Sequence, residues 1–511
     1  MRHYLLFVAS PAQIKRAKEG LRSLDAEYIQ DRSLADCYRL HHRSFNGFEV
    51  QLHLLGDLNA VIPHLRQYPV DLMIYDERMG GVDAVRAMDS LRVDVEELTS
   101  MWGPDFHFPL SRAVVILDGG PQAAEKTFRL GRDHIRDVMV APRSFFTVLR
   151  WIGRLLQIDL QQNQYKVGCA MSGGGLEGFL YQIGCAWALE KAFSGRSLHE
   201  CDIFSGISSG SLVTTALAAH VPIDELIRAI HGTSSVLPKI SGSLAYDFAF
   251  QDIGRRLFDQ SLSWGGLDIN RWVRKAVRSI PTGFFRGEQL RDLVRNILEV
   301  YGREDRFSDL SGELYIGATN QDSFSHVVFG REPWNEVPVS EAVRASCALP
   351  PFFTPGKIDG QYFIDGLITR TCNLELTIRE GCNLVFIIDP MRPHPSSTPG
   401  YVDKMGGWYT LIQTVKTLVH TRFRSSLSHL AARYHHVDFM IFQPYEECAE
   451  AMSGSPMKYR LSTRIIDLAF KETLQRLRER HPVYVAKLAK YGFQLASQRQ
   501  LLELERKGID I

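Results

Sequence analysis

The stretch "CDIFSGISSGSLVTTALAAH", residues 201–220, joins a short apolar run to a helix-forming run through a turn of serines and glycines. The first run predicts a strand, and the second predicts a helix whose N-terminus points at the turn. A serine at such a sharp turn needs small neighbours, because the strained backbone brings flanking side chains into contact. Only Ser208 has glycines two positions before and two after it, Gly206 and Gly210. The pattern predicts Ser208 as a nucleophile, although Gly-x-Ser-x-Gly also arises by chance in a long, glycine-rich chain.

A second glycine-rich turn, "SGGGLEG" at residues 172–178, follows the apolar run "YKVGCAM" and opens a predicted helix. Successive glycines let backbone N–H groups surround an anionic atom, and the helix dipole favours negative charge there. The turn therefore predicts an oxyanion hole or a phosphate cradle. Gly173, Gly175 and Gly178 also fit the G-x-G-x-x-G of dinucleotide-binding proteins. That interpretation is disfavoured because no acidic residue ends a second strand where a ribose partner is expected.

A third motif, "GQYFIDGLI" at residues 360–368, places Asp365 at the end of an apolar strand and Gly366 at the start of a turn. An isolated Asp-Gly is more often only a turn. Here it follows a glycine-rich loop and a serine turn in one ordered arrangement, and this order makes Asp365 a candidate functional residue.

Five blocks together resemble the patatin-like phospholipase family, over roughly residues 165 to 390. They are "AMSGGGLEGFLYQIGCAWALE", "FSGISSGSL", "GELYIGATNQDS", "EAVRASCALPPFFTP" and "YFIDGLI". The resemblance implies a three-layer α/β/α sandwich and hydrolysis of fatty acyl esters in lipids or phospholipids, of the phospholipase A or lysophospholipase type. It also implies a Ser-Asp dyad without a catalytic histidine, with Ser208 as nucleophile and Asp365 as base. An acyl-serine would form, and N–H groups around Gly173, Gly174 and Gly175 would supply the oxyanion hole.

Two residues depart from the family pattern. Glu177 stands where the loop usually has arginine, and Leu367 follows the Asp-Gly where glycine or alanine is usual. A negative charge near the oxyanion opposes the transition state unless it points away. These departures motivate an alternative of another class, a catalytically weak lipid-binding or scaffold protein that retains the fold.

A Ser-Asp-His triad esterase is a further alternative, because histidines follow Asp365 in the chain order of α/β-hydrolases. The candidates share a position downstream of the Asp-Gly and are His394, His420, His429, His435 and His436.

Residues 1–158 alternate apolar runs with amphipathic stretches, which predicts a flavodoxin-like, doubly wound α/β domain. The block "YPVDLMIYDERMGGVD" resembles a response-regulator receiver domain and maps the phosphoacceptor to Asp76. The other positions depart from that pattern: Ala9 and Ser10 replace the acidic metal ligands, Ala141 replaces the lysine, and Asp118 replaces the usual Ser or Thr. We therefore expect a degenerate receiver-like domain that acts in homodimerisation or partner sensing.

Composition sets further expectations. The 511 residues exceed one ordinary domain, and we expect domains at 1–158, 165–390 and 391–511, the last a helical extension. The net charge of +1 gives no case for nucleic acid, and eight scattered cysteines predict neither a metal site nor disulfides. No cofactor is expected. The sequence predicts no signal peptide or transmembrane helix, and we expect a cytoplasmic location.

The segment 404–437 carries five Lys or Arg residues and no carboxylate, with apolar residues at helical spacing. A basic amphipathic helix can lie on an anionic membrane, which would place the protein peripherally at the inner face. The alternative is a helix packed on the catalytic domain or in a dimer, and it is favoured because such stripes are usually core.

Overall fold

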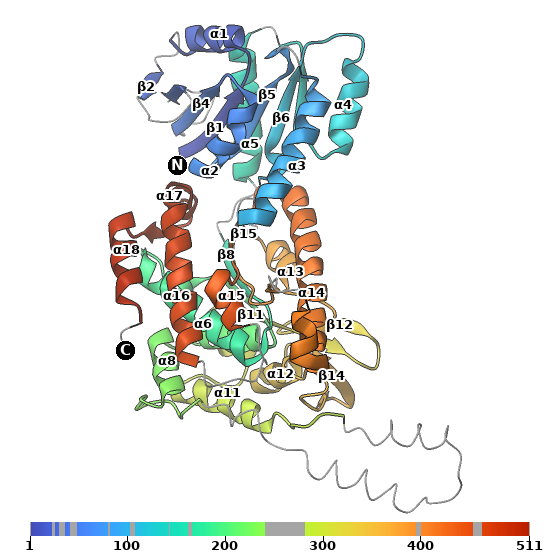
Figure 1. Cartoon of the computed structure of the whole chain (residues 1–511), viewed down its shortest axis with the longest axis vertical. Helices are drawn as coiled ribbons and strands as arrows, with labels where there is room; N and C mark the ends of the chain where they lie inside the picture. Colours follow the sequence, from blue (N-terminus) through green and yellow to red (C-terminus); the bar gives the residue numbers. More distant parts are fainter. Residues whose placement is uncertain are drawn as a thin grey trace, which may run out of the picture.

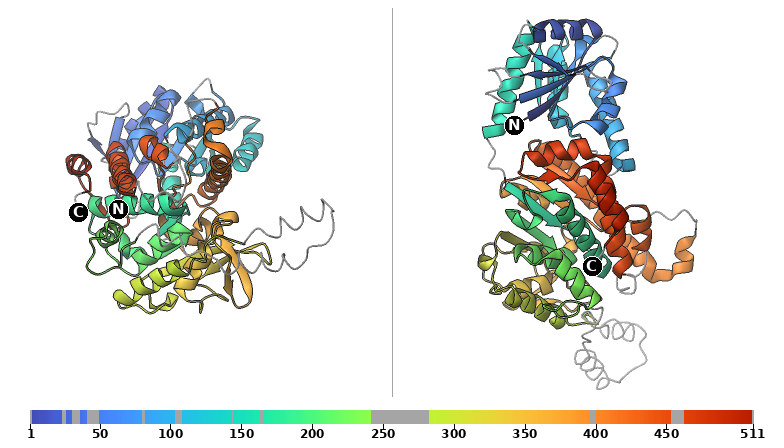
Figure 2. Two further views of the ribbon diagram at one scale, coloured as in Figure 1. Left: turned by 60° about the horizontal axis from the view of Figure 1, so that its bottom comes forward. Right: turned by 90° about the vertical axis from the view of Figure 1, so that its left-hand side faces the viewer.

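The structure is a computed structural model in which two α/β bodies are stacked along the long axis of the molecule (Figure 1). The side view in Figure 2 shows each body with its own sheet, the N-terminal body uppermost. The described residues are 2–22, 26–29, 36–40, 49–79, 82–102, 108–142, 144–161, 166–240, 282–394, 400–452 and 462–509.

The N-terminal sheet has seven strands in the order β2-β3-β4-β1-β5-β6-β7. Five of them are the apolar runs that the sequence predicts: β1 (Arg2–Val8), β4 (Glu49–Leu55), β5 (Leu72–Asp76), β6 (Ala113–Leu117) and β7 (Asp137–Val140). These five are parallel. Numbered along the chain they lie in the order 2-1-3-4-5, which is the order of flavodoxin-like sheets. The doubly wound α/β architecture expected here is what the structure has.

Two short strands at the edge of this sheet were not predicted. They are β2 (Glu27–Ile29) and β3 (Asp36–Leu40), and both pair in antiparallel fashion. Helices cover both faces and bury two separate apolar cores. One face carries α1 (Pro11–Arg22) and α5 (Phe145–Gln161), and the other carries α2 (Val61–Gln67), α3 (Ala84–Trp102) and α4 (Ala123–Arg132).

The second sheet has the order β13-β14-β11-β10-β8-β15-β16, with β12 paired to β11. Strands β11, β10, β8, β15 and β16 are mutually parallel, so their carboxyl ends share one edge. The chain leaves β8 in one direction through β10 and returns to its other side through β15, so the strand order reverses beside β8. Ligands bind at such reversal points in open α/β sheets. The bounds are β8 (Lys166–Met171), β10 (Ile203–Ile207), β11 (Glu313–Asn320), β12 (Ser325–Phe329), β13 (Gly356–Ile358), β14 (Gln361–Asp365), β15 (Cys382–Ile388) and β16 (Asp438–Phe442).

Helices cover both faces of this sheet and make a three-layer α/β/α sandwich, as the sequence resemblance predicted. The larger core lies under α6 (Gly175–Ala192), α7 (Ser209–Ala218), α8 (Ile223–His231), α11 (Glu288–Val300), α12 (Val339–Ser346) and α16 (Ser462–Glu479). The opposite core lies under α13 (Leu374–Arg379) and α14 (Tyr401–Arg433). The remaining elements are β9 (Phe193–Ser194), α15 (Glu446–Ala451), α17 (His481–Ala489), β17 (Gln494–Leu495) and α18 (Gln498–Lys507).

The region 391–511 is not helical throughout, contrary to the sequence prediction. Its strand β16 pairs in parallel with β15 and becomes the edge of the second sheet. Its helix α16 packs along α6 in the larger core. Much of this region therefore completes the second body.

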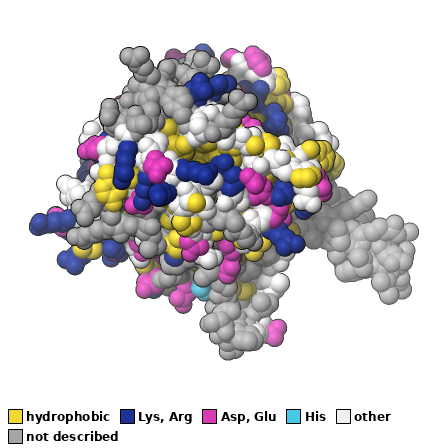
Figure 3. All heavy atoms as spheres, turned by 90° about the horizontal axis from the view of Figure 1, so that it is seen from above, with side chains coloured by type: hydrophobic (Ala, Val, Ile, Leu, Met, Phe, Trp, Pro, Cys, Tyr) yellow, Lys and Arg dark blue, Asp and Glu magenta, His cyan; other side chains and the backbone are white. Residues whose placement is uncertain are grey.

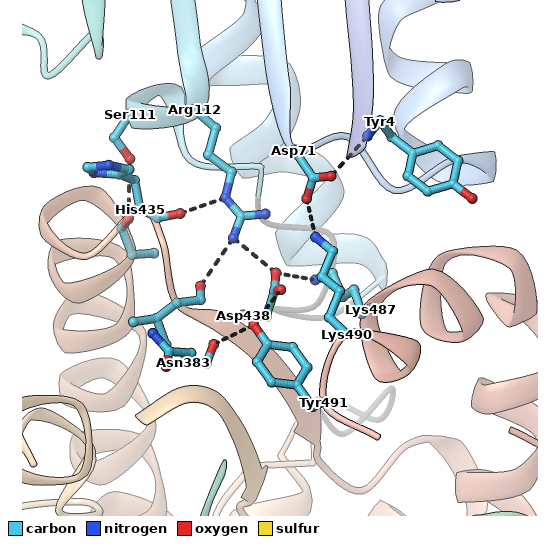
Figure 4. A network of polar contacts seen from close by, with 12 residues as sticks. Tyr4, Asp71, Ser111, Arg112, Asn383, His435, Asp438, Lys487, Lys490 and Tyr491 are labelled. Atoms are coloured by element: carbon cyan, nitrogen blue, oxygen red, sulfur yellow. Dashed lines mark hydrogen bonds and ion pairs between the residues drawn. The ribbon is translucent and has the colours of Figure 1, made fainter. Parts of the chain in front are cut away.

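The two bodies meet through a buried network of charged side chains (Figure 4). Arg112, just before β6, donates to Asp438 at the start of β16 at 3.0 Å and to the backbone carbonyls of His435 and Val437. Lys490 pairs with Asp71, which precedes β5. Tyr491 donates to the other Asp438 oxygen at 3.1 Å. The contact between the bodies therefore depends on charge complementarity.

The end of the molecule formed by the N-terminal body interleaves basic, acidic and hydrophobic side chains, with several Lys and Arg gathered near its centre (Figure 3). Among the described helices, none combines the length and the apolar character needed to cross a membrane.

Candidate active site

Ser208 sits between β10 and α7, at the sharp turn that the sequence predicted. Its backbone has φ 52° and ψ −127°, a positive φ that is rare for a residue with a side chain. The Ser346 hydroxyl accepts the Ser208 N–H at 2.8 Å, and the Ser211 hydroxyl donates to the Ser208 carbonyl at 2.6 Å. Two hydrogen bonds thus hold the backbone in a conformation that costs of order 1–3 kcal/mol when unsupported.

The glycines around this turn allow the backbone segments to approach closely. A Cβ at Gly206 would lie 2.3 Å from Thr214 Oγ1, and one at Gly210 would lie 2.5 Å from the Met171 carbonyl oxygen. The glycine-rich loop after β8 lies against the same turn, because a Cβ at Gly173 would lie 2.8 Å from the Ser208 Cβ. The structure therefore brings the two glycine motifs together around one serine.

Asp365 ends β14 and is completely buried. Its Oδ1 accepts the backbone N–H of Leu367 at 2.9 Å. Its Oδ2 has no hydrogen-bond partner within the described ranges of the chain. Burial raises the pKa of Asp365 to about 7, against smaller lowering effects of the Leu367 N–H and the nearby Ser208 hydroxyl. Ser208 and Asp365, separated along the chain, thus lie together with a carboxyl group poised near neutral pH.

The glycine-rich loop passes directly into α6, which begins at Gly175. The first turn of a helix leaves its N–H groups without helical acceptors, and the helix dipole adds favourable potential for an anion. Ser172, the residue before the loop, is held by two hydrogen bonds. Its hydroxyl donates to Asp389 at 2.5 Å, and its backbone carbonyl accepts from the Gln182 amide at 2.5 Å. Gly174 and Gly178 pack on Pro390. The loop is therefore fixed at both ends beside Ser208.

A narrow cavity of about 170 Å³ opens at Ser208 and is mostly apolar. It runs between α7, α11 and α14, and Gly174, Gly175 and Leu367 also line it. Its far walls are formed by Leu212, Leu226, Leu293, Val294, Ile297 and Phe352. Such a cavity suits an unbranched hydrocarbon chain better than a polar group.

Glu177, one of the two departures from the family pattern, is buried in the first turn of α6. The buried ammonium of Lys416 on α14 lies near it. Burial lowers the pKa of Lys416, whereas the Glu177 charge opposes that change and raises it. The negative charge of Glu177 therefore has a cation close by, which limits its effect on the loop.

Leu367, the second departure, lies over the loop. A Cβ at Gly173 would come within 2.5 Å of Leu367 Cδ1, so the leucine fills the space above that glycine. It packs with Ile207, Met391 and Val419 in a small apolar cluster. Gly366 beside it approaches the Gly317 carbonyl, where a Cβ would lie 2.4 Å from the oxygen. Leu367 thus lines the cavity beside the glycine-rich loop.

The five histidines of the triad alternative all belong to the second body. The described lining of the cavity at Ser208 contains no histidine. His394 lines a different cleft, and His429 is exposed. The His420 ring lies near Asp389, and His435 contacts the N-terminal body through its carbonyl. His436 packs its ring against Tyr434 and His435.

Asp76 ends β5 and is completely buried. Arg78 holds both carboxylate oxygens, at 2.8 Å through Nε and 2.6 Å through Nη2. Lys126, across the same edge, pairs with Glu77 and Asp83. No group of metal-ligating side chains is present among the described residues. A phosphoryl group on Asp76 would have to displace Arg78, but the degenerate receiver-like character and the roles in dimerisation or sensing stay predictions.

Helix α14 contains most of the basic amphipathic segment 404–437, with a kink at Gly406. Ile412 and Val419 are buried, whereas Leu411 and Leu418 are 47% and 66% exposed. One side of the stripe therefore packs on the second body, and membrane contact by the other side stays a prediction.

Three residues that contribute to the site were not predicted. Ser346 holds the Ser208 N–H, Asp389 holds the residue before the glycine-rich loop, and Lys416 lies near Glu177. Ser346 falls within the block "EAVRASCALPPFFTP", so a polar residue inside that apolar block was the available signal. For Asp389 and Lys416 no local pattern indicates the partner.

The fold and the site together define an α/β protein with a serine at a strained strand–helix turn, a buried carboxyl beside it and an apolar cavity in front. Residues 169–378 match the family model described as patatin-like phospholipase. This segment of the chain is a patatin-like phospholipase domain, as the sequence resemblance predicted.

Two individual proteins are similar to the chain. Over 192 residues it is 23% identical to the cUMP-AMP-activated phospholipase of Escherichia coli, a match that covers 36% of this chain and 47% of that protein. The chain thus spans about half the length of this curated relative. The crystal structure of VipD from Legionella pneumophila matches 62% of this chain and 67% of that one, with a TM-score of 0.31 and 15% identity.

Proposed function

We propose that the protein is a lipid acyl hydrolase that cleaves fatty acyl esters of lipids or phospholipids through a Ser208–Asp365 dyad. The observation that carries the proposal is the meeting of Ser208, at positive φ, with the buried Asp365 carboxyl at the mouth of an apolar cavity. The patatin-like phospholipase domain at residues 169–378 supports the same chemistry.

In the proposed reaction Asp365 accepts the hydroxyl proton while Ser208 Oγ bonds to the ester carbonyl carbon. The tetrahedral intermediate collapses, the C–O bond to the leaving alcohol breaks, and the proton on Asp365 passes to that alcohol. Water then attacks the acyl-serine while Asp365 again accepts a proton. The bond between Ser208 Oγ and the acyl carbon breaks, the proton on Asp365 returns to Ser208 Oγ, and the fatty acid is released. The raised pKa of Asp365 makes it a stronger base than an exposed carboxylate and also a competent acid.

The negative charge on the ester oxygen develops beside Gly173, Gly174 and Gly175 in this proposal. The N-terminus of α6 and the fixed backbone of the loop support that assignment. Removing a single donor from such a site in other enzymes costs about 3–4 kcal/mol of transition-state stabilisation. Anchoring of the loop by Asp389 is therefore as important as the dyad.

The apolar cavity would bind the acyl chain of the substrate. Each methylene moved from water into such an environment contributes about 0.8 kcal/mol. Side chains of α7 and α11 line part of the cavity, among them Leu212, Leu293 and Ile297. We therefore expect longer acyl chains to bind more tightly until the cavity is filled. A dyad is preferred over a Ser-Asp-His triad because no described histidine shares this cavity.

A fluorophosphonate probe followed by intact mass analysis tests the proposal directly. The wild type is expected to gain one adduct, and Ser208→Ala is expected to gain none. Ser209→Ala is the matched control, because the neighbouring Ser209 hydroxyl has no hydrogen-bond partner among the described residues and its loss breaks no bond. An unlabelled wild type that is folded would instead favour the catalytically weak lipid-binding or scaffold protein.

A further inference from the structure

A second cleft lies where the N-terminal body meets the second body. Its volume is about 820 Å³. Helix α2 contributes Arg66 to one wall, and Arg392 follows β15. Arg476 comes from α16, and Arg480 lies between α16 and α17. Small-molecule sites are often found at interfaces between domains and have volumes of about 300–1,000 Å³. The size and position of this cleft are therefore those of a ligand site.

The charge of the cleft is predominantly positive. Two carboxylates, Glu472 and Glu479, line it beside the four arginines. Both carboxylates already accept hydrogen bonds from the protein. Glu472 accepts the N–H groups of Tyr445 and Cys448 at 2.9 and 3.0 Å, and Glu479 accepts the Gln475 amide at 2.9 Å. The arginines consequently outnumber the acids and give the cleft a local excess of positive charge.

Tyr445 arranges two of these arginines. The guanidinium of Arg392 lies 4.1 Å from the centre of its ring and that of Arg476 lies 5.3 Å from it. A contact of this kind restrains the plane of the Arg392 guanidinium while leaving its edge free to donate. Arg392 Nη1 and Tyr445 Oη are buried from solvent and have no hydrogen-bond partner in the described part of the chain. Donors held in this way are suited to an anion in the cleft.

We propose that this interdomain cleft binds a phosphate-bearing small molecule of nucleotide size. Guanidinium groups match phosphate oxygens with paired N–H donors, and several converging arginines favour a ligand with more than one negative charge. The cleft is also partly apolar, with Tyr181, Phe442 and Ala449 in its wall. The phosphate can belong to a soluble nucleotide or to a lipid headgroup, and the two sources are distinguished below.

The cleft is connected to the glycine-rich loop by two hydrogen bonds. Gln443 lines the cleft and donates to Asp389 Oδ2 at 2.7 Å. Asp389 Oδ1 in turn accepts the Ser172 hydroxyl, directly before Gly173. A ligand that moves Gln443 would change the anchoring of the oxyanion loop. The regulatory half of the inference, that the ligand alters the hydrolysis rate, rests on the proposed function, whereas the binding half does not.

Calorimetric titration of the full-length protein with ADP and with inorganic pyrophosphate tests the binding. We expect saturable binding at one site per chain, weakening as salt is raised. Arg392→Gln and Arg66→Gln are expected to raise the dissociation constant at least tenfold each. Arg478→Gln is the matched control on α16, because Arg478 pairs with Glu505 outside the cleft and should leave binding unchanged. Circular dichroism melting of every variant verifies that it is folded.

Vesicles distinguish the two sources of phosphate. Binding of ADP or pyrophosphate that depends on Arg392 assigns a soluble ligand. A lipid headgroup is assigned if neither ADP nor pyrophosphate binds and the protein sediments with phosphatidylcholine vesicles only when they contain phosphatidic acid. This sedimentation must also depend on Arg392. The proposal is overturned if neither probe binds, or if folded Arg392→Gln and Arg66→Gln bind as the wild type does.

Hydrolysis of p-nitrophenyl butyrate with and without the probe that binds tests the regulatory half. We expect the ligand to change the wild-type rate severalfold, and Gln443→Leu to bind the ligand but lose that change. An unchanged wild-type rate under saturation overturns the regulation and leaves the binding site standing. Absence of any esterase activity contradicts the proposed function, while the titration still decides the binding.

Discussion

Asp365 connects the geometry of the site to its pH dependence. Burial raises its pKa to about 7, and the base form exists only above that value. The rate constant kcat/KM for a neutral ester should therefore rise with pH and level off above about pH 7. A pH–rate profile measures this directly. An inflection near pH 4, the ordinary range of a solvated carboxyl, would contradict the raised pKa of Asp365.

The same pKa makes a prediction about stability. Because the folded state raises the pKa from 3.8 to about 7, the neutral form of Asp365 is favoured in the fold. Stability linked to this group is fully present below pH 3.8 and is lost as pH rises to about 7. Asp365→Asn stays neutral and can still accept the Leu367 N–H. At pH 8 the free energy of unfolding of Asp365→Asn should exceed that of the wild type by up to about 4 kcal/mol. This figure takes about 1.36 kcal/mol per pKa unit.

Denaturant titrations of Asp365→Asn and the wild type at pH 8 and at pH 4 check this expectation. The difference between the two proteins should shrink at the lower pH. If the variant is less stable than the wild type at pH 8, the Asp365 carboxylate must be stabilised in the fold, which would contradict the raised pKa.

At the scale of single residues, the sequence predicted the positions that local spacing constrains. Gly206 and Gly210 singled out Ser208 because glycine is needed where the turn meets Thr214 and the β8 loop. The nearby cation of Glu177 was not predictable, because Lys416 lies on α14, far along the chain, and nothing in the segment 404–437 indicates that it faces Glu177. Local spacing contains no information about which distant side chain faces a given charge.

At the scale of elements, the packing of α7 on the β8 loop determines where Ser208 points. Gly210→Ala would place a Cβ 2.5 Å from the Met171 carbonyl and 2.6 Å from that of Ser172. We expect a loss of about 1–3 kcal/mol in stability from overpacking, together with reduced esterase activity. Thermal unfolding and ester hydrolysis measure the two effects.

Gly131→Ala is the control for this substitution. Gly131 lies within α4 of the N-terminal body with open space where a Cβ would be. Its replacement should stabilise the helix by about 0.5–1 kcal/mol and leave hydrolysis unchanged. Equal behaviour of the two variants would show that the Gly210 contact does not matter.

The strands missed by the sequence analysis share a physical cause. Strand β2 at the sheet edge has only three residues, β3 beside it has five, and "DFMIF" of β16 lies within a region of mostly helical pattern. Such segments become strands because a neighbouring strand offers backbone hydrogen bonds. Strand β16 pairs with β15, although the whole of α14 lies between them in the sequence. By contrast, the apolar runs of β1, β5, β6 and β8 could be predicted, since both of their faces are buried.

At the scale of the whole molecule, the charged network between the two bodies should make them interdependent. Burial alone would raise the pKa of Asp438, but Arg112, Lys490 and Lys487 outweigh it and lower that pKa to about 2. Its stabilising contribution is therefore complete above its ordinary value of 3.8 and is lost as pH falls toward 2. This pairing of distant segments could not be predicted from sequence.

Arg112→Met tests that interdependence. Removing one partner of a buried ion pair leaves the other uncompensated, and the expected loss is about 3–5 kcal/mol at pH 7. Combining it with Asp438→Asn in a double-mutant cycle isolates the pair from its neighbours. Arg499→Gln, which removes an exposed pair with Glu503, should cost less than about 1 kcal/mol. A loss for Arg112→Met no larger than that of Arg499→Gln would contradict a structural role for the network.

The most direct test of the central claim is the release of fatty acid from phosphatidylcholine micelles by the full-length protein. The proposed dyad predicts release by the wild type, and a loss of at least about a thousandfold in kcat both in Ser208→Ala and in Asp365→Asn. It also predicts that alanine at His394, His420, His429, His435 or His436 leaves kcat within a few fold of the wild type. Undiminished release by Ser208→Ala, or a loss as large as that of Ser208→Ala on replacing one histidine, would contradict it.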